Sequence, residues 1–263
     1  MIVVISIAVV SGIPAAGSDL VHGAFVALGV AVAALLFHHE VRRRGVTDDR
    51  MWVIVALALA GGALMARLGT WFQHVDLRAN ASLFEQWVYG NRSILSGLVG
   101  AWGGVHLGKR LTGYRERTGD LFAPAVAAAM ALGRIGCLLT ERPGTPTGTG
   151  FGITLPPEQA QLLGAPAGIA LHPSFGYEIA FHVVAFLVIW RLRDALTRRG
   201  DLFIGYVAAY AIFRFGVEFV RGNEVVWAGL TRPQLFLLVS APLLARRAAG
   251  IRVRTSTLTG RVT

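Results

Sequence analysis

The chain has 263 residues, of which 54% are hydrophobic and only 15% charged, and its mean hydropathy is +0.57. A soluble domain of this length needs more polar surface, so the composition excludes an ordinary water-soluble enzyme. The formal net charge of +10 would suggest a nucleic-acid partner for a soluble protein. In a membrane protein, anionic lipid of the inner leaflet accounts for basic loops, and we therefore expect no nucleic-acid partner.

The first 17 residues are apolar but carry no basic amino-terminal region. Gly12, Pro14 and Gly17 interrupt them. This stretch is either an interfacial segment, which we favour, or a weak signal peptide.

Seven apolar runs follow, and a run of roughly 17–25 residues is long enough to cross a bilayer. The composition and these runs predict an all-α, polytopic membrane protein with seven transmembrane helices. We expect one transmembrane domain over residues 1–246, with an outer loop at 141–174, and a basic cytoplasmic tail at 247–263. The runs lie at about 21–38, 51–69, 93–108, 121–140, 175–192, 202–220 and 231–246.

The distribution of arginine and lysine predicts the orientation. Basic residues concentrate in loops 39–50, 109–118 and 191–200 and in the tail after residue 246, whereas the alternate connections hold few. The positive-inside rule then places the amino terminus outside and the carboxyl terminus in the cytoplasm. We expect a multi-pass protein of the cytoplasmic (inner) membrane.

Three arginines fall within or near the ends of predicted spans: Arg67, Arg134 and Arg214. An arginine at mid-membrane costs roughly 2.5–3.5 kcal/mol, so it lines a cavity or has a partner. One such residue near a span end can simply reach the interface with its long side chain. Three of them favour a shared polar cavity. His22, just before the first run, is either an interfacial anchor or a polar group at the cavity mouth.

The fourth run ends in a polar cluster, Gly133-Arg134-Ile135-Gly136-Cys137, followed by Thr140 and Glu141. The glycines allow helices to approach closely and so admit Arg134 into a tight interior. Cys137 is the only cysteine, which excludes a disulfide within the chain. It is more typical of a small packing residue than of a nucleophile. We expect no metal and no cofactor.

The outer loop ends in the sequence HPSFGYE, residues 172–178. Pro173 biases His172 toward an extended conformation and suits the first turn of a helix, with Ser174 a plausible N-cap. Glu178 either compensates the helix dipole in that first turn or forms a proton-transfer set with His172 and Tyr177.

The sixth run carries Tyr210, Arg214 and Glu218 at i, i+4 and i+8, with Arg221 three residues further on. This spacing puts them on one face of a helix. Arg214 and Glu218 can form an ion pair that only fixes helix packing. The surplus of positive charge instead favours a guanidinium clamp on phosphate oxygens, which is the interpretation we prefer.

In order and spacing, several motifs resemble the prolipoprotein diacylglyceryl transferase family, especially its divergent branch with the signature Gly-Arg-Ile-Gly-Cys. The resemblance covers about residues 20–240. The motifs are His22-Gly23, Ala66-Arg67-Leu68-Gly69, SILSGLVG at 93–100, Gly133-Arg134-Ile135-Gly136, HPSFGYE at 172–178, and Tyr210-x3-Arg214-x3-Glu218-x2-Arg221.

The resemblance implies transfer of a diacylglyceryl group from phosphatidylglycerol to the lipobox cysteine of a preprolipoprotein at the outer face of the membrane, with glycerol phosphate leaving. It implies that Arg134 and Arg214 are the essential guanidiniums that hold the phosphate. Tyr210, Glu218 and Arg221 would support them.

The chain departs from the family pattern at several positions. Leu95 replaces a histidine, Cys137 and Thr140 replace asparagines, Glu141 comes one position early, and His22 replaces a tyrosine. The remaining candidates for the base that deprotonates the acceptor are His172, Glu141 and His22, in that order. We expect catalytic roles for Arg134, Arg214, His172 and Glu141, and substrate binding by Arg67, Tyr210, Glu218, Arg221, Tyr177, Glu178 and His22.

Three alternatives stay open. The chain is a non-catalytic relative that binds or moves phospholipid, a transferase with an acceptor other than a lipoprotein, or a small-solute transporter or channel. The absence of a visible sequence repeat and the single arginine-rich face count against a transporter.

Overall fold

The computed structural model describes residues 15–71 and 93–252. Most of the apolar stretch 1–17 and of the basic tail lies outside the described residues. The chain divides into two compact units: Gly45–Glu116 forms one, and Met1–Arg44 together with Arg117–Thr263 forms the other.

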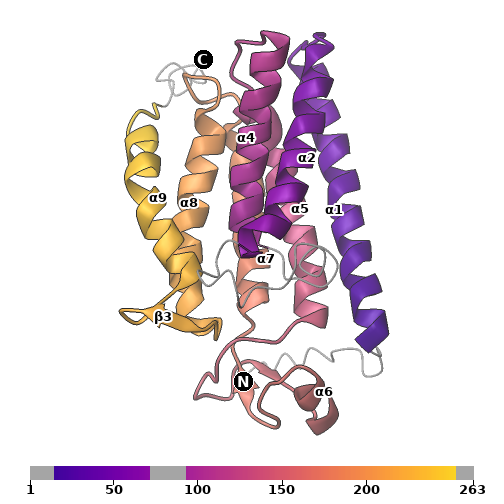
Figure 1. Ribbon diagram of the computed structural model, residues 1–263, viewed down its shortest axis with the longest axis vertical. Coiled ribbons are helices and arrows are strands. Elements are labelled where there is room, and N and C mark those ends of the chain that lie inside the picture. Colours follow the sequence, from indigo (N-terminus) through magenta and orange to yellow (C-terminus); the bar gives the residue numbers. More distant parts are fainter. Residues whose placement is uncertain (1–14, 72–92, 253–263) are drawn as a thin grey trace, which may run out of the picture. The chain divides into compact units, whose positions relative to one another are not determined.

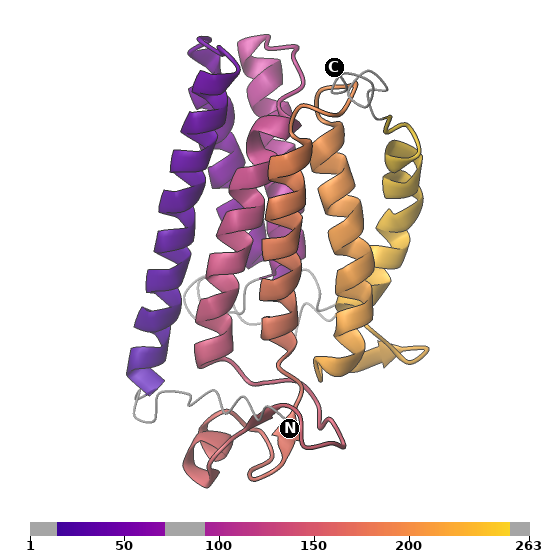
Figure 2. The same cartoon turned by 180° about the vertical axis from the view of Figure 1, so that it is seen from behind.

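The larger unit is a helical bundle (Figure 1; Figure 2 shows it from behind). Helix α1 packs against α5, α5 against α7 and α8, and α8 against α9. Ala123 and Ala127 of α5 meet Ile189 of α7 and Tyr206 of α8 in a buried core. The helices are α1 (Ala15–Arg43), α5 (Gly119–Thr140), α7 (Ser174–Leu192), α8 (Asp201–Val217) and α9 (Arg232–Ala248).

Among the described residues, five helices are long and apolar enough to cross a membrane. This finding confirms the predicted class, a mostly helical protein with several membrane spans. Helices α4 (Ile94–Thr112) and α9 cover the third and seventh predicted runs but are not among the five. The candidate spans are Leu20–Arg43, Arg50–Gly69, Gly119–Thr140, Ser174–Leu192 and Asp201–Val220.

The segment between α5 and α7, predicted as a loop, contains structure of its own. Strands β1 (Ile153–Thr154) and β2 (Ala170–Leu171) pair antiparallel, and the short helix α6 (Pro157–Leu162) lies between them in the chain. Ile153, Leu155, Ala160 and Leu171 form a small hydrophobic core. Figure 1 shows this segment beyond the adjoining ends of α5 and α7.

A β-hairpin connects α8 to α9. The 3₁₀ helix η1 (Glu218–Val220) leads into β3 (Val225–Trp227), which pairs with β4 (Leu230–Thr231). Ala228 and Gly229 both have positive φ, as a tight hairpin turn requires. Thr231 and Gln234 then form a capping box that starts α9.

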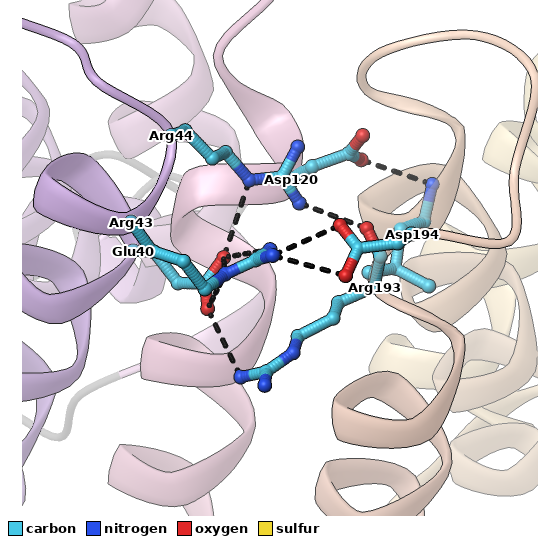
Figure 3. Close-up of polar contacts among 7 residues, drawn as sticks. Glu40, Arg43, Arg44, Asp120, Arg193 and Asp194 are labelled. Atoms are coloured by element: carbon cyan, nitrogen blue, oxygen red, sulfur yellow. Dashed lines mark hydrogen bonds and ion pairs between the residues drawn. The ribbon is translucent and has the colours of Figure 1, made fainter.

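At the opposite end of the bundle from this hairpin, an ionic cluster joins α1 to α7 (Figure 3). Glu40 is fully buried and accepts hydrogen bonds from Arg43, Arg44 and Arg193. Asp194 binds the Nη1 of Arg43 at 2.9 Å. These arginines, which the sequence suggested only as charges facing anionic lipid, therefore have partners within the protein.

The smaller unit consists of α2 (Arg50–Trp71) packed against α4. Gly100, Gly104 and Gly108, one helical turn apart, are buried in α4. A Cβ atom on Gly104 would clash with the backbone carbonyl of Leu57. Ser93 caps α4 by accepting a hydrogen bond from the backbone N–H of Ser96 at 3.3 Å. The motif SILSGLVG thus contains the helix start and part of a close helix–helix contact.

This contact gives a matched pair of substitutions. We expect Gly104→Ala to lower the melting temperature in detergent by roughly 5 °C, because overpacking costs about 1–3 kcal/mol. Gly103→Ala is the control, because a Cβ added there would meet no neighbouring atom within 4 Å and alanine favours a helix over glycine. Equal melting temperatures for the two variants would contradict the close approach of α2 and α4.

Candidate active site

The polar residues predicted from the sequence gather at one end of the larger unit. Arg134 lies in the last two turns of α5, Glu178 in α7, and Tyr210 and Arg214 in α8. All four are buried, and Glu178 is 0% exposed. Because α7 runs antiparallel to α5 and α8, the end of α5, the start of α7 and the end of α8 lie at the same end of the bundle.

Glu178 is the centre of the first cluster. One carboxylate oxygen, Oε2, lies 2.6 Å from Arg134 Nη2 and accepts a hydrogen bond from the Tyr210 hydroxyl at 3.2 Å. The other oxygen, Oε1, binds Arg221 Nη1 at 2.6 Å. Two guanidiniums from different elements thus share one carboxylate, and this geometry fixes their separation.

Phe175 contacts both guanidiniums with its ring. The Cζ of Arg221 lies 4.3 Å from the ring centroid and that of Arg134 lies 5.7 Å away. Arg134 also reaches the Cys137 sulfur with Nη1 at 3.8 Å, but its buried Nε has no partner among the described residues. That nitrogen remains an available donor.

Glu218 is the centre of the second cluster. Its carboxylate pairs with Arg214, as the spacing predicted, and also accepts hydrogen bonds from Asn223 and from Thr231. The Thr231 hydroxyl lies 2.9 Å from Oε1. The hairpin after α8 therefore folds back and holds the carboxylate that orients Arg214.

The charges of these two clusters do not cancel. Arg134, Arg214 and Arg221 face two buried carboxylates, Glu178 and Glu218, which leaves one positive charge in excess among the buried groups. A third carboxylate, Glu141, lies 4.0 Å from Arg221 but is exposed to solvent. All three guanidiniums act electrostatically on Glu178. Burial lowers the pKa of Arg221, an effect that Glu178 opposes, but a guanidinium remains protonated in proteins. Excess positive charge in a buried site is suited to an anion.

The predicted proton-transfer set does not form as one group. The Nδ1 of His172 lies 3.1 Å from the Tyr177 hydroxyl, whereas Glu178 is occupied by Arg134 and Arg221. Backbone hydrogen bonds to Gly144 and Thr145 hold His172 in place. Glu178 therefore does not join His172 in one proton-transfer set, whereas Tyr177 contacts His172 directly.

The predicted start of α7 also needs correction. Pro173 is the N-cap and Ser174 the first helical residue, without a side-chain cap. Glu178 lies beyond the first turn, so dipole compensation there does not explain it. Its two arginine partners do, because a buried carboxylate needs compensating charge.

Three further polar residues meet where α1 crosses the end of α5. His22 Nδ1 lies 3.9 Å from the Cys137 sulfur and 3.9 Å from Glu141 Oε1. Gly136 makes this contact possible, since a Cβ there would lie only 3.3 Å from the Cα of His22. His22 is therefore a polar group at the edge of the arginine clusters.

Several residues near the site were not identified from the sequence. His182 and Tyr206 are buried next to Tyr210, and the His182 Nδ1 lies 3.0 Å from the Tyr206 hydroxyl. His182 follows Glu178 by four residues and Tyr206 precedes Tyr210 by four, so helical spacing was the available signal. Asn223 and Thr231 gave no such signal, because their role depends on the hairpin.

Arg67 lies in α2, in the smaller unit. Its predicted contribution to a cavity shared with Arg134 and Arg214 stays a prediction.

Both clusters lie in the part of the chain that matches a known protein family. The sequence model of the prolipoprotein diacylglyceryl transferase family matches residues 20–249. The chain belongs to the prolipoprotein diacylglyceryl transferase family. This membership confirms the predicted resemblance and, with it, the prediction of a membrane transferase.

Relatives of this transferase come from several bacteria. A phosphatidylglycerol–prolipoprotein diacylglyceryl transferase of Clostridium tetani is 30% identical over 209 residues, covering 77% of this chain and 80% of the relative. The enzyme of the same name from Geobacillus kaustophilus is 28% identical and covers 87% and 88% of the two chains. That of Halalkalibacterium halodurans is 30% identical, with 88% and 83% covered. The similarity thus extends over more than three quarters of each protein.

Proposed function

We propose that this chain transfers a diacylglyceryl group from phosphatidylglycerol to the cysteine of a prolipoprotein lipobox, at the outer face of the cytoplasmic membrane. The observation that carries the proposal is the arrangement of Arg134, Arg214 and Arg221 around two buried carboxylates, with one positive charge in excess. Such a site is suited to the phosphate of a lipid headgroup. The names of the relatives supply the donor and the acceptor.

In this scheme the arginines act on the leaving group. The acceptor sulfur attacks the glycerol carbon, the carbon–oxygen bond to phosphate breaks, and glycerol phosphate departs with the electron pair. Guanidiniums already held by Glu178 and Glu218 stabilise that charge without reorganising, and a water-poor site strengthens the effect. The proton of the acceptor thiol needs a base, and His172 is the first candidate.

Mass spectrometry tests the proposal directly. Purified protein in detergent is mixed with isotope-labelled phosphatidylglycerol and a lipobox peptide, with a peptide carrying serine in place of cysteine as the control. The expected result is the mass of a diacylglyceryl thioether on the cysteine peptide only. Release of labelled glycerol phosphate without peptide modification would indicate a different acceptor, and no turnover would favour the non-catalytic alternative.

We further propose seven spans within one transmembrane domain, an external amino terminus and a cytoplasmic tail. Reporter fusions after residues 45 and 115 are expected to read cytoplasmic, and one near residue 155 external, because basic loops stay inside. Residue 45 precedes α2 and residue 115 follows α4, so two cytoplasmic signals would indicate that α2 and α4 both cross the membrane or that neither does. A cytoplasmic signal at residue 155 would contradict this topology.

We expect His172→Gln to lower turnover by roughly 10²–10⁴-fold, because general-base catalysis contributes about that much. Lipid binding should change little, since His172 lies outside the arginine clusters and contacts Tyr177. The measurement is kcat with lipid and peptide both saturating. His38→Gln is the control, because His38 is exposed and lies near the carboxyl-terminal end of α1, whereas the site is near the amino-terminal end of that helix. Unchanged turnover in His172→Gln would assign the base to Glu141 instead.

A further inference from the structure

Three side chains that offer different metal-ligand atoms converge at the edge of the arginine clusters. The imidazole Nδ1 of His22, the sulfur of Cys137 and a carboxylate oxygen of Glu141 all lie within 4.8 Å of one another. His22 comes from α1, Cys137 from α5, and Glu141 directly follows α5. From this geometry we infer a binding site for a late first-row divalent cation, with Zn²⁺ the foremost candidate.

The distances fit such an ion. Tetrahedral zinc with nitrogen, oxygen and sulfur ligands requires ligand atoms roughly 3.3–3.6 Å apart. The Nδ1 of His22 lies 3.9 Å from both the sulfur and the nearer Glu141 oxygen. These two pairs need to close by only a few tenths of an ångström, and the sulfur and the carboxylate oxygen, which lie within 4.8 Å of each other, by at most about 1.2 Å.

The direction of the ring distinguishes a metal site from a catalytic relay. In a cysteine–histidine–carboxylate relay, the sulfur and the carboxylate contact different nitrogens of the imidazole. Here the same Nδ1 faces both Cys137 and Glu141. Three donor atoms within 4.8 Å of one another can be brought onto one cation.

The surroundings orient the ligands and balance the charge. Glu141 Oε2 lies 4.0 Å from Arg221, which leaves Oε1 directed toward His22. Arg134 Nη1 donates a hydrogen bond to the Cys137 sulfur at 3.8 Å, which helps to hold that side chain in place. A divalent ion bound by one thiolate and one carboxylate makes a neutral site, with the thiol proton released on binding. Such outer contacts commonly hold metal ligands in position.

The three residues are also positions at which this chain departs from the motifs that it resembles: His22 for tyrosine, Cys137 for asparagine, and Glu141 one position early. Nitrogen, sulfur and carboxylate ligands together suit zinc, whereas Mg²⁺ prefers oxygen alone. Three protein ligands leave a fourth position for water or an incoming thiol. The inference revises our expectation of no metal, and it does not depend on the proposed transfer reaction.

Cobalt substitution tests this site, because Cys137 is the only cysteine of the chain. The full-length protein in detergent is stripped with a chelator and titrated with Co²⁺. The expected result is a thiolate-to-cobalt charge-transfer band, with the intense visible bands of tetrahedral Co²⁺, saturating at one ion per chain. Any thiolate band must come from Cys137, so Cys137→Ser should abolish it.

The other ligands are tested by His22→Ala and Glu141→Gln, with His38→Ala as the control. Each ligand variant should weaken Co²⁺ binding by more than the roughly 10–100-fold that loss of an outer contact costs. A second measurement needs no variant: Zn²⁺ should raise the melting temperature of the unmodified protein, and Mg²⁺ should not. Absence of a thiolate band at saturating Co²⁺, or unchanged binding in His22→Ala and Glu141→Gln, would overturn the proposal.

Discussion

Replacing Arg214 by lysine should lower kcat/KM for diacylglyceryl transfer by roughly 10²–10³-fold, the usual cost of removing one charge-stabilising donor from an active site. Lysine keeps the positive charge and can still pair with Glu218. It cannot present two parallel N–H groups to a phosphate, as a guanidinium does. The loss should therefore appear mainly in activity and little in the melting temperature.

Arg191→Lys is the matched control for this variant, because Arg191 is exposed at the opposite end of α7. Both proteins are assayed with labelled phosphatidylglycerol at saturating peptide, and kcat and KM are determined separately. If Arg214 holds charge that develops on the leaving phosphate, kcat falls with kcat/KM. Turnover of Arg214→Lys within twofold of the unmodified protein would show that the Arg214–Glu218 pair only fixes helix packing.

Glu178→Gln should lower both stability and activity. The amide retains the shape of the side chain but removes the charge that Arg134 and Arg221 share. Breaking a buried ion pair from one side costs about 3–5 kcal/mol, because the remaining charge is left without compensation. For a chain of this size, that corresponds to a fall in melting temperature on the order of 10 °C.

Glu158→Gln provides the control, since Glu158 is exposed on α6 and the chemical change is the same. The double variant Glu178→Gln/Arg221→Gln should lose less stability than the two single losses added together, because it removes both members of one pair. Thermal unfolding in detergent of the unmodified protein, the two single variants and the double variant supplies the four melting temperatures that this comparison needs. Additive losses would mean that Arg221 and Glu178 contribute independently, contrary to the contact between them.

Sequence by itself determined the class of the protein and identified some residues of the site, namely Arg134, Arg214 and Glu218. Hydropathy predicted membrane helices because a span must be apolar along its whole length. The i, i+4 spacing identified the Arg214–Glu218 pair, since that distance is fixed within one helix. Charge inside an apolar run identified Arg134 because such a residue is too costly to occur without a partner.

Tertiary structure decided which partners these residues have. Glu178 joins Arg134 to Arg221 only because α5, α7 and the end of α8 meet, and no spacing along one helix encodes that meeting. Likewise, Thr231 reaches Glu218 through the fold of a hairpin. His22, Cys137 and Glu141 come together because Gly136 lets α1 approach α5 closely. Contacts between distant segments depend on helix packing, and the local pattern of a single sequence does not specify it.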